Sequence, residues 1–114
     1  MKNASNQRAK STMNPYLVQQ IQTASPEKLI HILYDVGIKA CRKRDRVKVG
    51  QVLTELISAL NFDYHETAVT FFNLYHFALD EANKGHFQNS KMVLEGLDDI
   101  WLNYVMSHGD ESSI

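Results

Sequence analysis

The side chains of this 114-residue chain that most readily take part in chemistry are five histidines and one cysteine. The histidines are His31, His65, His76, His86 and His108. A zinc site on a helix needs two ligands four residues apart, and no two of these histidines have that spacing. Cys41 has no second cysteine for a CxxC motif or a disulfide, and nothing around it marks a cleft for a nucleophile. We therefore expect no metal site, no cofactor and no enzymatic activity.

Positive charge gathers between residues 39 and 48. Residues 1–48 hold ten of the twelve Lys and Arg residues, and the remainder holds ten of the thirteen Asp and Glu residues. This asymmetry is compatible with nucleic-acid binding. A protein that binds single strands also needs aromatic side chains between the basic ones, and this cluster has none. The cluster also suits the negative end of a helix dipole and the acidic second half of the chain. A nucleic-acid-binding or regulatory helical protein is therefore the alternative function, and its site is the basic cluster: Lys39, Arg42, Lys43, Arg44, Arg46 and Lys48.

The chain contains four consecutive amphipathic segments. These segments must position the histidines, Cys41 and the basic cluster. Only two prolines and five glycines are available for turns, which favours a few long helices over many short strands. Apolar residues recur with helical spacing from residue 26 to about 44, from 46 to 60, from about 63 to 83, and from 87 to 106. Because the links between these segments are short, we expect an all-α, antiparallel up-down-up-down four-helix bundle.

The sequence divides into three parts around that bundle. Residues 1–22 form an expected mobile tail whose end, with Tyr16, Leu17 and Ile21, makes a short segment docked on the helices. Residues 23–106 form the bundle, and residues 107–114 a frayed tail. We find no apolar run of the ~20 residues that a membrane span needs and no signal peptide. The expected compartment is therefore the cytoplasm.

Local signals define several helix ends. Ser25 followed by Pro26 is typical of a helix start, because serine caps a free amide and proline lacks one. Asp63 and Glu66 have the spacing of a capping box for the third helix. Gly85 suits the end of the third helix, since glycine adopts positive φ at little cost.

Two helices carry more apolar residues than one buried face requires. On the first helix Ile30, Tyr34 and Ile38 form a second row beside the stripe of Leu29, Leu33 and Val36. On the third helix Leu74 and Phe77 lie outside the main stripe. Such rows indicate either a wider core or a groove for a partner, and the spacing alone leaves both interpretations open.

The most specific motif is Thr23-Ala24-Ser25-Pro26-Glu27-Lys28-Leu29-Ile30, followed by Leu33-Tyr34-Asp35. It resembles the TASPxxLI stretch and the LYDG motif of the FliS family of flagellin export chaperones. Weaker matches follow in the same order along the chain: Asn14-Pro15-Tyr16, Gln51 to Leu60, Glu66 to Tyr75, Glu81-Ala82-Asn83 and Trp101. Val36-Gly37 departs from the family's Gly-Ala, and the stretch from Ile38 to Gln51 is shorter than usual.

The resemblance implies a cytoplasmic chaperone that binds the C-terminal segment of flagellin and prevents premature polymerisation. Other flagellar export or regulatory proteins are further expected partners, whereas nucleic acid and membrane insertion are not expected. The resemblance also implies that the N-terminal segment covers part of the binding groove until the client arrives. A structural homodimer is a third hypothesis. The expected partner-binding residues are Tyr16, Leu17, Ile21, Ile30, Tyr34, Ile38, Leu74 and Phe77.

Overall fold

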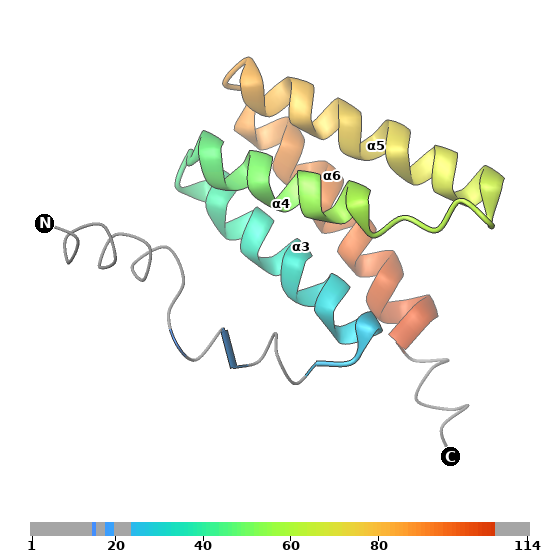
Figure 1. Ribbon diagram of the computed structural model, residues 1–114. Helices are drawn as coiled ribbons and strands as arrows, with labels where there is room; N and C mark the ends of the chain where they lie inside the picture. Colours follow the sequence, from blue (N-terminus) through green and yellow to red (C-terminus); the bar gives the residue numbers. More distant parts are fainter. Residues whose placement is uncertain (1–14, 16–17, 20–23, 107–114) are drawn as a thin grey trace, which may run out of the picture.

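A computed structural model of the chain describes Pro15, Val18, Gln19 and residues 24–106. Residues 24–106 contain four α-helices, which are α3 (Pro26–Arg42), α4 (Arg46–Ser58), α5 (His65–Asn83) and α6 (Phe87–Ile100). A π-helical segment, η1 (Trp101–Met106), continues α6 (Figure 1). The described residues contain no strand, which confirms the predicted all-α class. The expected docking residues Tyr16, Leu17 and Ile21 lie outside the described residues, as do both terminal stretches.

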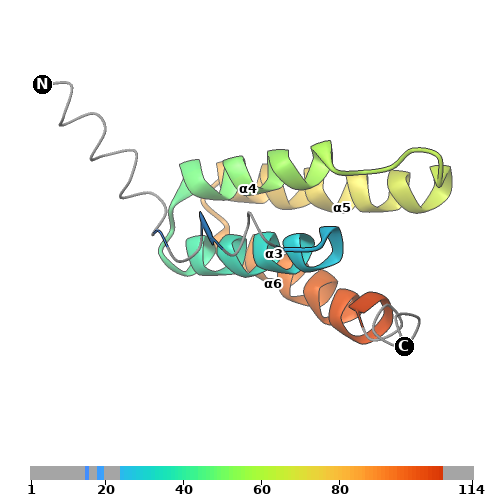
Figure 2. The ribbon, with the colours of Figure 1, turned by 60° about the horizontal axis from the view of Figure 1, so that its bottom comes forward.

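Each helix packs against two others. α3 contacts α4 and α6, and α5 contacts the same two helices from the opposite side. Figure 2 shows α4 and α5 together in one layer, with α3 and α6 in the layer below. This arrangement is consistent with the predicted four-helix bundle, because every amphipathic helix buries its apolar stripe against its neighbours.

Side chains cap the first two helices. The Ser25 hydroxyl accepts a hydrogen bond from the Lys28 backbone N–H at 3.2 Å, with Pro26 at the first helical position, as predicted. The Asp45 carboxylate accepts from the Lys48 N–H at 3.1 Å and starts α4 in the same way. Each cap satisfies a first-turn amide that has no partner within its helix.

Of the two predictions made for the ends of α5, the structure contradicts the one for the start and confirms the one for the end. The predicted capping box is wrong, because α5 begins after Tyr64 with no side-chain cap. The Asp63 backbone N–H donates instead to the Asn61 side-chain oxygen at 2.9 Å, which makes a turn before the helix can start. At the other end, Gly85 has φ of 85°, as expected for a residue that ends a helix.

The core lies where the four helices meet. Tyr34 is fully buried and Ile38 is 7% exposed, whereas Leu29 and Leu33 of the neighbouring stripe are only partly buried. Tyr34 and Ile38 of the second row of α3 therefore belong to the core, whereas Ile30 of the same row is only partly buried. Ser90 is also fully buried, and its hydroxyl donates to the Ala78 carbonyl at 2.6 Å, joining α6 to α5.

Candidate functional site

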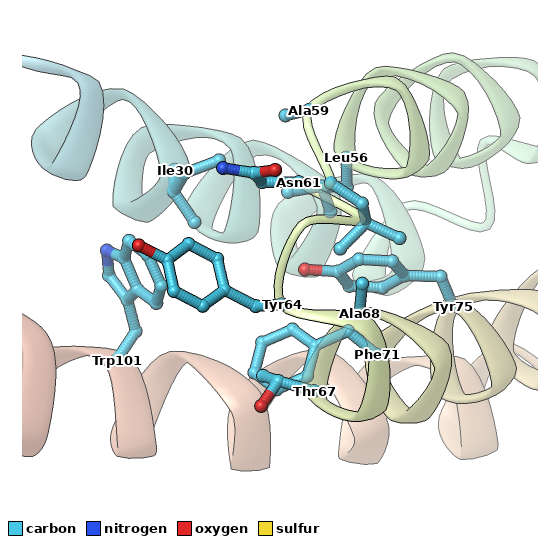
Figure 3. Close-up of a pocket in the computed structure, with 11 residues that line it drawn as sticks. Ile30, Leu56, Ala59, Asn61, Tyr64, Thr67, Ala68, Phe71, Tyr75 and Trp101 are labelled. Carbon is cyan, nitrogen blue, oxygen red and sulfur yellow. The ribbon is translucent and has the colours of Figure 1, made fainter.

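An apolar pocket with a volume of about 390 Å³ opens at one end of the helices. We call it the end pocket. It is formed by the first turns of α3, the last turn of α4 with the link after it, the first turns of α5, and the start of η1 (Figure 3). The residues that line it are Ile30, Leu56, Ala59, Leu60, Asn61, Tyr64, Thr67, Ala68, Phe71, Tyr75 and Trp101.

Aromatic rings dominate the walls of the end pocket. The Trp101 indole N–H donates to the Glu27 carbonyl at 2.8 Å, which ties the start of η1 to the first turn of α3. Phe71 meets Tyr75 edge to face, with ring centroids 6.0 Å apart. Figure 3 shows the rings of Trp101, Tyr64, Phe71 and Tyr75 following one another along the pocket. Trp101, Phe71 and Tyr75 are therefore held by specific contacts before any ligand arrives.

The pocket combines a buried floor with an accessible rim. Leu56, Ala68 and Tyr75 are buried in the core. Tyr64, in the link between α4 and α5, is 70% exposed. Because Tyr64 is so exposed, part of its ring can be covered by a partner at a gain in free energy. This combination suits the binding of apolar side chains.

The lining residues of the end pocket are apolar or carry neutral polar groups. The eleven lining residues include no carboxylate, histidine, lysine or cysteine. Burial raises the pKa of the Tyr75 phenol above its ordinary value of 10.0, so this hydroxyl stays protonated at neutral pH. The groups that line the pocket can therefore offer apolar surface and neutral hydrogen bonds.

A second exposed apolar surface runs along the outside of α5. Leu74 is 36% exposed and Phe77 is 48% exposed. Glu81, seven residues after Leu74, accepts a hydrogen bond from Asn89 of α6 at 2.8 Å, so this side of α5 borders α6. Thr67 precedes Leu74 by seven residues and lines the end pocket, so the surface of Leu74 and Phe77 continues from that pocket along α5.

The structure separates the residues that the sequence grouped as partner-binding. Ile30 lies in the end pocket, and Leu74 and Phe77 lie on the outer face of α5. The interpretation of Tyr34 and Ile38 as groove residues is corrected, because both pack in the core and cannot touch a partner in this conformation.

The sequence analysis did not name Tyr64, Phe71 or Trp101 as partner-binding residues. All three line the end pocket. A signal was available, because aromatic residues near the start of one helix and the end of another meet when consecutive helices alternate in direction. Periodicity within single helices does not reveal such a meeting.

Three side chains of the basic cluster make contacts within the chain. The Lys39 ammonium lies 3.0 Å from the Asp35 carboxylate, and the Arg42 guanidinium 3.8 Å from Glu95. The Arg44 guanidinium stacks over the Phe87 ring, 4.9 Å from its centroid. Any nucleic acid bound at this cluster would compete with these three contacts.

Other groups with chemical potential have structural surroundings. Burial raises the pKa of the Cys41 thiol to about 11, which keeps it protonated and weakly nucleophilic. In the described part of the chain, no three His, Cys, Asp or Glu side chains are arranged to hold a metal ion. Within those same residues, no helix combines the length and apolar character of a membrane span.

The chain was also compared with known proteins. Its sequence matches no protein-family model and no curated protein, and no solved structure matches it.

Proposed function

We propose that this protein is a cytoplasmic export chaperone of the FliS kind, which binds the C-terminal segment of flagellin and prevents its premature polymerisation. The observation that carries the proposal is the end pocket, an apolar cavity with an exposed aromatic rim. The TASPEKLI and LYD motifs support it from the sequence. Partners of the proposed chaperone also include other flagellar export proteins, and exclude nucleic acid.

The proposal includes alternation of helix direction along the chain, up-down-up-down. Two features support it. The end pocket draws on the starts of α3 and α5 and on the ends of α4 and α6. The links are short, spanning residues 43–45, 59–64 and 84–86, and short links favour antiparallel neighbours.

A disordered amphipathic segment is a suitable occupant. Pockets for small ligands measure about 300–1,000 Å³, so a volume of about 390 Å³ holds a few anchoring side chains. Each buried Leu, Ile or Phe side chain contributes about 1.5–3 kcal/mol, against which the segment loses chain entropy. The rest of the segment extends over Leu74 and Phe77, where exposed apolar surface continues from the pocket.

The N-terminal segment has an assigned place in this proposal. Tyr16, Leu17 and Ile21 compete with the client for the apolar surface, as the family resemblance implies. A chain that lacks residues 1–22 is then expected to bind the client at least as tightly as the full chain.

The test is a calorimetric titration of the full chain with a peptide spanning the C-terminal segment of flagellin. We expect saturable binding, and light scattering should show delayed flagellin polymerisation when the protein is present. Leu74→Ala with Phe77→Ala should weaken binding. Val47→Ala is the matched control, because Val47 is an exposed apolar residue on α4 outside both surfaces. An intact, folded chain that does not bind the peptide would contradict the proposal.

A further inference from the structure

Charge is distributed unevenly around the end pocket. The segments that form this end of the molecule, residues 24–31, 55–67 and 97–104, contain six carboxylates and one lysine. The lysine is Lys28, and the carboxylates are Glu27, Glu55, Asp63, Glu66, Asp98 and Asp99. The basic cluster of residues 39–48 belongs to the opposite end of α3 and α4.

Five of these carboxylates have no ion-pair partner among the described residues: Glu27, Glu55, Asp63, Glu66 and Asp99. Asp98 differs, because its carboxylate lies 2.8 Å from the His31 ring. The Lys and Arg ion pairs of the described chain use Asp35, Glu81 and Glu95 instead. Within the described part of the chain, these five carboxylates are therefore not neutralised by ion pairs.

Three of the unpaired carboxylates belong to residues that adjoin lining residues of the pocket, in sequence or through a backbone hydrogen bond, and we call them the acidic collar. The carbonyl of Glu27 accepts the indole N–H of Trp101, which lines the pocket. Asp63 precedes Tyr64, and Glu66 precedes Thr67, both of which line it. All three collar residues are exposed. Charges so close to the rim act on a bound segment within the Debye length of ~8–10 Å at physiological salt.

The geometry points to a specific class of occupant, a peptide segment whose apolar anchors are flanked by Lys or Arg. This inference rests on the proposed function and gives its client a chemical signature. The apolar anchors fill the end pocket, and the flanking cations face Glu27, Asp63 and Glu66. Complementary charge of this kind speeds encounter and rejects segments with acidic flanks, while burial supplies most of the affinity.

The test compares three synthetic peptides that share one apolar helix-forming core and carry flanks of lysine, glutamine or glutamate. Calorimetry with the full chain should show the lysine peptide binding about tenfold more tightly than the glutamate peptide at low salt, since several exposed pairs add up. The difference should vanish in 1 M salt, where the Debye length falls to ~3 Å.

Charge-removing variants assign the effect to the collar. Glu27→Gln, Asp63→Asn and Glu66→Gln together should abolish the preference for the lysine peptide. The matched control is Asp35→Asn, Asp80→Asn and Glu95→Gln, which removes the same number of charges from other parts of the surface. It should keep the preference. Thermal melts of both triple variants verify that they are folded.

The outcomes separate this inference from the proposed function. If all three peptides bind equally, the charge inference is overturned while apolar binding stands. If the lysine peptide binds and the flagellin peptide does not, the inference is supported and the flagellin assignment fails. If none of the peptides binds, both are overturned. If sedimentation at low salt shows assemblies that the collar triple variant abolishes, the collar is occupied by a second copy and the inference is overturned.

Discussion

The hydroxyl groups of Tyr34 and Tyr75 lie 2.7 Å apart in the centre of the helices and form a buried hydrogen bond between α3 and α5. These two helices are diagonal in the arrangement, since each packs mainly on α4 and α6. Burial raises the pKa of both phenols above 10.0, so both remain neutral. Because Tyr75 also lines the end pocket, this bond holds part of the floor on which the proposed function depends.

Removing one hydroxyl should cost more than removing both. Tyr34→Phe leaves the Tyr75 hydroxyl buried without its partner, and we expect a loss of about 1–3 kcal/mol in the free energy of unfolding. Tyr34→Phe combined with Tyr75→Phe should lose clearly less than the sum of the single changes. Urea unfolding of the four proteins gives the coupling. Strictly additive losses would show that the two hydroxyls do not act as a pair.

Close packing around Gly37 can be tested by comparing how Gly37→Ala and Gly96→Ala change the free energy of unfolding. A Cβ atom at Gly37 would lie 2.9 Å from Leu94 Cδ1 and 3.1 Å from Val52 Cγ1, whereas one at Gly96 meets nothing within 4 Å. Gly96→Ala should raise the free energy of unfolding by about 0.5–1 kcal/mol through helix propensity. Gly37→Ala should fall short of that gain by about 1–3 kcal/mol, because the methyl group overfills the core. Equal gains at both positions in denaturant titrations would contradict the close contact of α3 with α6.

We expect protonation of the Glu81 carboxylate at acidic pH to lower the free energy of unfolding. Hydrogen bonds from Asn89 and, second, from His86 lower the pKa of the Glu81 carboxyl below its ordinary value of 4.5. A lowered folded-state pKa stabilises the fold above the unfolded-state pKa, and this stabilisation is lost as the pH falls through the folded-state value. The free energy of unfolding, measured by urea titration, should therefore decrease from about pH 5 to about pH 3. Glu81→Gln should flatten that slope, and Glu66→Gln, which removes an exposed carboxylate without an ion pair, should not. An unchanged slope in Glu81→Gln would exclude Glu81 as its source.

Helix positions and two of their ends were predictable from the sequence because their causes are local. Ser25 caps α3 and Gly85 follows α5, and each depends on the chemistry of one residue and its neighbours. The capping box at Asp63 and Glu66 did not form, and the cause is also local. Two side chains, those of Asn61 and Glu66, could accept a hydrogen bond from the Asp63 backbone N–H. Asn61 takes the Asp63 N–H, so the turn prevails over the cap.

The candidate site was less predictable, because it depends on how the helices meet. Periodicity found both apolar rows of α3, yet a helix with two neighbours buries more than one row, so Tyr34 and Ile38 could not be assigned to core or groove. Ile30 was found, but its partners Tyr64 and Trp101 come from other elements. Their convergence is a property of the packed structure.

The most direct test of the central claim is to fill the end pocket and measure client binding. Thr67 is exposed and lines the pocket, so Thr67→Trp places a large side chain in the cavity while α5 stays intact. Thr54→Trp is the matched control, because Thr54 is exposed on α4 and does not line the end pocket. Titration with the flagellin C-terminal peptide should show at least a tenfold loss of affinity for Thr67→Trp, about 1.4 kcal/mol, and little change for Thr54→Trp. Parental affinity in a folded Thr67→Trp variant would contradict the assignment of the end pocket as the binding site.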